Sequence, residues 1–203
     1  MLRQLGSAVA KPSITNLIMK TQYYTATSIN GYIADENNSL DLLFQFGMIE
    51  SMQTCFPRFI SKVGAVAMGS TTYKWVVEQE KILENPEKWP YKIPTWVFSR
   101  RKLPVVDGAD IRFVRGNVAP LHAEMEKVTD GKNLWIVGGG DLVGQFYDHG
   151  LLDEIILSVA PVMLGSGAPL FPRNVTAPPM KLVDIQKHED VFATIIYEVQ
   201  KSH

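Results

Sequence analysis

Three short stretches of this chain combine small residues, hydroxyl groups and cations in a way that suits a phosphorylated ligand. Each stretch directly follows an apolar, strand-like run: Gly69-Ser70-Thr71, Ser99-Arg100-Arg101 and Gly138-Gly139-Gly140. Hydroxyls and free backbone N–H groups at the start of a helix attract anions. Guanidinium groups bind phosphate oxygens in pairs, and glycines let the backbone approach a ligand closely. Together the three stretches predict a site for a ligand with several phosphate groups.

Other well-characterised motifs do not fit the sequence. Asp141 and Leu142 follow the glycine run, and the third glycine of the G-x-G-x-x-G dinucleotide fingerprint is missing. No P-loop is present, and the segment 165–167 lacks the spacing of a G-x-S-x-G nucleophile elbow. The four histidines lack metal-ligand spacing and Cys55 is the only cysteine, so we predict no metal site.

Composition limits the partners and the compartment that we expect. The 203 residues are 46% hydrophobic and carry a net charge of −1, so no overall field draws the chain to nucleic acid or a membrane. No apolar run reaches the ~20 residues of a membrane span. We therefore expect a cytoplasmic protein that acts on a small molecule. Residues 1–18 lack any acid and indicate a flexible extension, with a transit peptide as the alternative, before a single domain over 19–203.

The elements that must position the three stretches alternate between strand and helix. Strands are predicted over 21–27, 63–68, 95–99, 111–114, 134–137 and 154–159. Helices are predicted near 47–62, from a Ser/Thr cap after Gly69 through Trp75, over 121–128 and from Leu142 to Tyr147. Two final runs, about 180–187 and 191–199, suit an antiparallel hairpin. The pattern predicts an α/β fold of three layers, α/β/α, with a mostly parallel central sheet and an antiparallel C-terminal edge hairpin.

Four segments occur in the order expected of a known family. They are SINGYIA (28–34), VAMGSTTY (66–73), WIVGGG (135–140) and LDEIILSVAPVMLGSGAPLF (152–171). Over about residues 20–199 the chain thereby resembles the dihydrofolate-reductase-like superfamily. The last and longest segment is similar to its riboflavin-biosynthesis reductase branch, the RibD C-terminal domain family.

The resemblance implies a site for NADPH and the residues that form it. Ala26 and Ile33 would border the nicotinamide end of the cofactor. The adenosine and its ribose phosphate would lie against Gly69, Ser70, Thr71, Ser99, Arg100 and Arg101. The diphosphate would lie against Gly138, Gly139, Gly140, Asp141 and Leu142. The resemblance also implies a cis peptide bond between Gly138 and Gly139.

The family's activity implies a reductase of the riboflavin-pathway type, which reduces a phosphorylated ribosylamino-pyrimidine with NADPH. Folate enzymes of the superfamily carry a buried carboxylate in the helix after the first loop, whereas residues 42–48 contain no acid. Asp35, Asp41 and Glu50 are the candidate catalytic acids, and the residues do not choose among them. A dihydrofolate reductase-type enzyme and a dimeric NADPH-binding module without catalysis are the alternatives.

Self-association is a further expectation. The C-terminal hairpin carries Ile195, Ile196 and Tyr197, which would cover a sheet edge in a homodimer or else fill the core.

Overall fold

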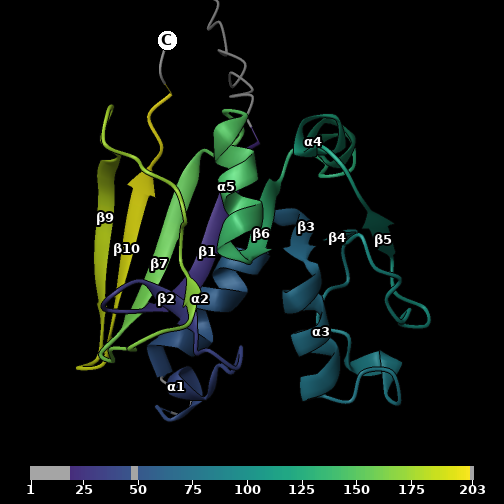
Figure 1. Ribbon diagram of the computed structural model, residues 1–203, viewed down its shortest axis with the longest axis horizontal. Coiled ribbons are helices and arrows are strands. Elements are labelled where there is room, and N and C mark those ends of the chain that lie inside the picture. The colour runs from purple at the N-terminus through teal and green to yellow at the C-terminus, as the bar shows by residue number, and fades with distance from the viewer. Residues whose placement is uncertain (1–18, 47–49, 202–203) are drawn as a thin grey trace, which may run out of the picture.

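The computed structural model describes residues 19–46 and 50–201, and these form a large sheet flanked by helices (Figure 1). Eight strands lie in the order β5-β4-β3-β6-β1-β7-β10-β9. Neighbours from β5 to β7 run parallel, and β10 pairs antiparallel with both β7 and β9. The strands are β1 (Thr21–Ser28), β3 (Val63–Gly69), β4 (Thr95–Phe98), β5 (Ile111–Val114), β6 (Asn133–Gly138), β7 (Glu154–Ala160), β9 (Lys181–His188) and β10 (Phe192–Glu198).

Helices cover both faces of this sheet, which gives the predicted three layers. α4 (Val118–Glu126) and α5 (Gly140–Asp148) pack on one face, and α2 (Glu50–Ile60) and α3 (Ser70–Gln79) pack on the other (Figure 1). The prediction of a mostly parallel α/β sheet with an antiparallel C-terminal edge hairpin is therefore confirmed. No helix in the described part of the chain is long and apolar enough to cross a membrane.

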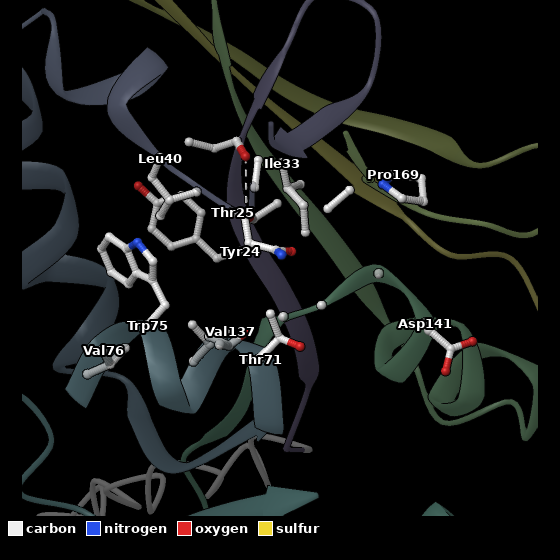
Figure 2. A pocket seen from close by; sticks show the side chains of 18 of the residues that line it. Tyr24, Thr25, Ile33, Leu40, Thr71, Trp75, Val76, Val137, Asp141 and Pro169 are labelled. Carbon is white, nitrogen blue, oxygen red and sulfur yellow. Dashed lines mark hydrogen bonds between the residues drawn. The ribbon is translucent and has the colours of Figure 1, made fainter. Parts of the chain in front are cut away.

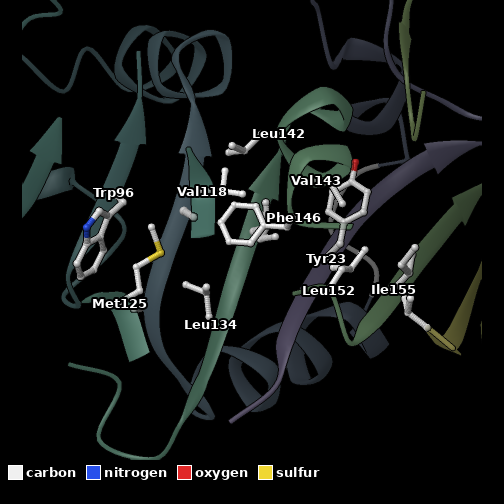
Figure 3. Packing of buried hydrophobic residues seen from close by; sticks show 14 residues of the cluster. Tyr23, Trp96, Val118, Met125, Leu134, Leu142, Val143, Phe146, Leu152 and Ile155 are labelled. Carbon is white, nitrogen blue, oxygen red and sulfur yellow. The ribbon is translucent and has the colours of Figure 1, made fainter. Parts of the chain in front are cut away.

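The central strands are apolar throughout because helices bury them on both sides. In β3, Ala65 and Ala67 belong to the cluster under α4 and α5, whereas Val66 and Met68 belong to the cluster under α2 and α3. All four side chains are fully buried. Figure 3 shows the first cluster, in which Phe146 of α5 lies among side chains of the sheet and of α4.

Two local features differ from the sequence prediction. The prediction that Ser or Thr side chains cap α3 is wrong, because the N-cap is Gly69 and no side chain bonds to the cap. The small sheet formed by β2 (Tyr32–Ala34) and β8 (Ala168–Pro169) was not predicted. Strands of two or three residues are too short to show a period in hydrophobicity.

Two predicted helices have shifted boundaries. The helix predicted over 121–128 begins earlier, at Val118, because the Asn117 side chain accepts a hydrogen bond of 2.7 Å from the Ala119 N–H. The helix predicted near 47–62 is α2, and residues 47–49 lie outside the described residues. Residues 1–18 also lie outside them, so the flexible extension and the domain start stay predictions.

Candidate functional site

The loops that follow β3, β4 and β6 meet at one edge of the sheet. These strands are neighbours and run parallel, so their carboxyl ends lie together. Met68 is in register with Gly138, and Gly69 with Phe98, the residue before Ser99. The topology thus places the three predicted phosphate-binding stretches side by side, at the edge where ligands bind in open α/β sheets.

Two helices start at this edge without a side-chain cap. The N-caps of α3 and α5 are Gly69 and Gly139, both in extended backbone, and neither helix has a side-chain hydrogen bond at its cap. The first N–H groups of a helix have no partner within the helix, and they carry its positive dipole end. Two such ends side by side are suited to bind a group with more than one phosphate.

The glycine run packs closely against the chain that crosses above it. A Cβ atom at Gly140 would lie 2.5 Å from the carbonyl oxygens of both Pro169 and Leu170, so only glycine fits there. A Cβ at Gly139 would meet no atom within 4 Å. The peptide bond between Gly138 and Gly139 is cis, as the resemblance implied.

A cavity of about 540 Å³ opens beside these loops (Figure 2). β1 and β6 form its floor, α3 forms one wall, and β2, β8 and the segment 38–44 border the remaining sides. Its lining consists of Tyr24, Thr25, Ala26, Ile33, Ala34, Asn38, Leu40, Phe44, Thr71, Thr72, Trp75, Val76, Tyr91, Trp135, Val137, Gly138, Gly139, Gly140, Asp141, Ala168, Pro169 and Pro172.

The border of the cavity is fixed by contacts between segments far apart in the sequence. The Asn30 side chain donates a hydrogen bond of 2.6 Å to the Leu164 carbonyl and accepts one of 3.1 Å from the Leu164 N–H. The Leu170 N–H donates to the Gly31 carbonyl at 2.8 Å. The loop 29–31 and the segment 164–170 are thereby held together over the site.

Many predicted cofactor residues line the cavity, and the others lie next to it in the chain or on the neighbouring strand. The lining includes Ala26, Ile33, Thr71, Gly138, Gly139, Gly140 and Asp141. Gly69, Ser70 and Leu142 adjoin these residues in sequence. Ser99, Arg100 and Arg101 do not line the cavity, and they follow β4 at the same sheet edge. The Ser99 hydroxyl donates to the Arg101 carbonyl at 2.9 Å and accepts from the Arg101 N–H at 3.0 Å. These two bonds close a tight turn over residues 99–101, in which both arginines are exposed.

Of the three candidate catalytic acids, Asp35 and Asp41 are described in full, and neither is among the lining residues. The Asp35 carboxylate accepts hydrogen bonds of 2.8 Å from the N–H groups of Asn37 and Ser39, so it stabilises its own loop. Asp41 is the exposed first residue of α1 (Asp41–Phe44). Glu50 begins α2, and its side chain lies outside the described part of the structure. Their catalytic roles stay predictions.

Sequence reasoning missed the aromatic side chains of the cavity. Trp135 and Tyr24 lie two residues before the lining residues Val137 and Ala26, on the same faces of β6 and β1. Trp75 lies one helical turn after Thr71 in α3. The strand period of two and the helix spacing of four were the signals that could have found them.

The comparisons with known proteins agree with this geometry. The family model of the RibD C-terminal domain matches residues 20–193. The chain belongs to this family. The uncharacterized protein YwjB of Bacillus subtilis is 35% identical over 75% of this chain and 82% of its own length.

Solved structures show the same fold. A putative riboflavin biosynthesis protein from Shewanella sp. PV-4 is similar with a TM-score of 0.74 and 25% identity, covering 90% of this chain and 100% of that one. A deaminase/reductase of Thermotoga maritima gives a TM-score of 0.60 at 15% identity, over 91% of this chain and 58% of that one. Dihydrofolate reductase from Enterococcus faecalis gives a TM-score of 0.58 at 12% identity, over 88% of this chain and 95% of that one. The fold of this RibD C-terminal domain is therefore dihydrofolate-reductase-like.

Proposed function

We propose that this protein is an NADPH-dependent reductase that transfers a hydride to a small molecule bound beside Ala26. The observation that carries the proposal is the convergence of two uncapped helix N-termini, those of α3 and α5, on one edge of a cavity. The glycine run leaves open space beside Gly139, so a diphosphate could approach the backbone there. The residues present therefore fit a phosphate-rich cofactor.

The cofactor, when bound, supplies the hydride. The chain's own residues would therefore bind the cofactor, orient it toward the substrate and shield both from water. The first N–H groups of α3 and α5 would hold the diphosphate, and Arg100 and Arg101 the extra ribose phosphate. Ala26 and Ile33 line the cavity without polar side chains, so a ring beside them would lose its contact with water. Family membership supports the reductase activity, as does the relative from Thermotoga maritima, which is named a 5-amino-6-(5-phosphoribosylamino)uracil reductase. The compound in that name, 5-amino-6-(5-phosphoribosylamino)uracil, is therefore the first substrate to test.

A cofactor titration tests the proposal. NADPH should raise the melting temperature more than NADH does, because only NADPH carries the ribose phosphate. Arg100→Ala should weaken NADPH binding roughly tenfold or more, because it removes a charge-assisted hydrogen bond that contributes about 1.5–3 kcal/mol. Arg58→Ala is the matched control, because Arg58 is an exposed arginine of α2 outside the cavity lining. Equal responses of the native protein to NADPH and NADH would refute the assignment.

We also propose that the protein forms a homodimer through the β9 edge of the sheet. Among residues 19–46 and 50–201, β10 is the one strand that pairs with β9, and β9 exposes Leu182, Val183 and Ile185 to 50%, 51% and 59%. An apolar sheet edge with free backbone groups favours pairing with another chain. Light scattering should give twice the chain mass, and Ile185→Lys should shift it to the monomer mass. A native protein with the monomer mass at high concentration would contradict this proposal.

A further inference from the structure

The two ends of the cavity differ in chemistry. Thr71, the glycine run and Asp141 lie at the end where the helices begin, and backbone groups and hydroxyls dominate there. The other end is apolar and is formed by Tyr24, Leu40, Phe44, Trp75, Val76, Tyr91 and Trp135. Figure 2 shows Leu40, Trp75 and Val76 gathered on the side opposite Asp141. A cofactor bound at the polar end leaves the apolar end for the substrate.

The described part of the apolar end offers no cationic side chain to pair with a phosphate group. Among the described residues that line the cavity, none is a lysine, arginine or histidine, and Asp141 is the single charged one. The segment 47–52, whose side chains lie outside the described part, contains no such residue either. Arg173 follows the lining residue Pro172, but its guanidinium donates to Asp148 at 2.8 Å and contacts Asp141 at 3.5 Å. A phosphate in this environment would lose its water without gaining a counter-charge, which is strongly unfavourable.

The same end presents flat apolar surfaces. The rings of Phe44 and Trp75 are nearly parallel, with an interplanar angle of 7° and centroids 6.0 Å apart. Phe44 leaves 57% of its surface exposed, although it borders a cavity. Across the cavity floor, the ring of Tyr91 meets Trp135 edge-on at 5.7 Å. Aromatic faces of this kind bind other planar rings by stacking, and a bound ring would also cover the exposed surface of Phe44.

We propose that the substrate reduced at this site is a flat, uncharged, conjugated ring compound with a ring carbonyl and without a phosphate. The inference rests on the proposed function, because it assigns the polar end to the cofactor. The hydride of NADPH would add to an electron-poor atom of the ring system. The carbonyl oxygen at the other end of the conjugated system would take up a proton from water and leave hydroxide. The products are the dihydro compound, formed as its enol, and NADP⁺. This substrate class differs from the phosphorylated ribosylamino-pyrimidine that the resemblance implied.

Tyr91 is the residue placed to bind the ring carbonyl. Its side chain lines the apolar end, and its hydroxyl has no hydrogen-bond partner among the described residues. Burial raises the pKa of this hydroxyl, so it stays protonated and can donate. A donor next to aromatic faces suits a neutral carbonyl better than it suits a dianionic phosphate.

A matched pair of unreactive probes tests the inference by binding alone. α-Naphthol and α-naphthyl phosphate share one planar ring system and differ in the phosphate. Each would be titrated calorimetrically into the protein saturated with NADP⁺ and, separately, into the cofactor-free protein. We expect α-naphthol to bind at least about tenfold more tightly, because the phosphate must be desolvated without a partner. Phe44→Ala should weaken the binding of α-naphthol about fivefold, because the ring that stacks on it is lost.

The controls separate this inference from the proposed function. Phe113→Ala removes an exposed aromatic ring of β5 outside the cavity lining, so it should leave both affinities unchanged. Equal or tighter binding of α-naphthyl phosphate, or failure of α-naphthol to bind, would overturn the ring preference even if NADPH binds. Failure of NADP⁺ to bind would instead refute the proposed function. In the cofactor-free protein, where α-naphthyl phosphate can also occupy the polar end, the binding of α-naphthol and its weakening in Phe44→Ala would still decide the ring preference.

Discussion

Replacing Gly140 by alanine should destabilise the protein, although alanine is the better helix former. Gly140 is the first residue of α5, and its backbone lies under the carbonyl oxygens of Pro169 and Leu170. An added Cβ would lie 2.5 Å from each oxygen and 2.9 Å from the Leu170 carbonyl carbon. All three atoms belong to the backbone, so no side chain can rotate away and the segment 169–170 must shift.

The expected cost follows from two opposing effects. Inserting a methyl group into a well-packed region costs about 1–3 kcal/mol. The helix propensity of alanine offsets up to about 1 kcal/mol of that cost. Because backbone opposes the methyl group on two sides, we expect a net loss of about 1–2 kcal/mol. In a domain of this size, that corresponds to a drop in melting temperature of roughly 2–8 °C.

Urea unfolding of the cofactor-free protein measures this loss, and the neighbouring glycine provides the control. Gly139 has φ −84° and ψ 178°, which any residue adopts, and its Cβ would meet no atom within 4 Å. Gly139→Ala should therefore leave the free energy of unfolding within about 0.5 kcal/mol of the native value. Gly139→Ala should still weaken NADPH binding, because its methyl group occupies space proposed for the diphosphate. A Gly140→Ala protein as stable as the native one would refute the packing argument.

Three further substitutions test other parts of the structure. Burial lowers the pKa of His122 against the opposite pull of Glu126 and Asp153, so the unfolded chain binds the proton more readily. The free energy of unfolding should therefore not be reduced by His122 above about pH 6.5, and it should fall as the pH drops from there to the lowered pKa of the folded state. Chemical denaturation at several pH values should show a smaller fall in His122→Gln than in the native protein. Asn30→Ala removes both hydrogen bonds to Leu164 and should cost about 1 kcal/mol, with faster hydrogen exchange at the Leu164 amide, and an unchanged exchange rate would contradict this role. Tyr91→Phe should lower kcat for a ring carbonyl substrate and leave NADPH affinity unchanged in steady-state kinetics and titration.

The polar end of the site could be predicted because it follows from the topology. Val63–Gly69 and Asn133–Gly138 are apolar strands buried on both faces, and parallel strands bring their carboxyl ends to one edge. The residue types after those strands then indicate what binds there. No knowledge of side-chain packing is needed for this step, and the predicted stretches do meet in the structure.

The apolar end could not be predicted in the same way. Trp75 and Trp135 each match the pattern of an ordinary core residue, on a helix and on a strand. Phe44 lies in a four-residue helix that gives no periodic signal. Only the packing of α1 against α3 brings the Phe44 and Trp75 rings together. The turn formed by Asp35 was accessible to sequence reasoning, because Asp commonly bonds to backbone N–H groups two residues later.

This difference determines how the two ends can vary. The polar end uses backbone groups at strand and helix junctions, so it changes little unless the sheet itself changes. The apolar end uses side chains of α1, α3 and the loop at Tyr91, and their replacement leaves the sheet order intact. Two proteins with this fold can therefore share a cofactor and differ in substrate. Family membership supports the cofactor assignment, whereas the substrate class has to be inferred from Phe44, Trp75 and Tyr91 in this chain.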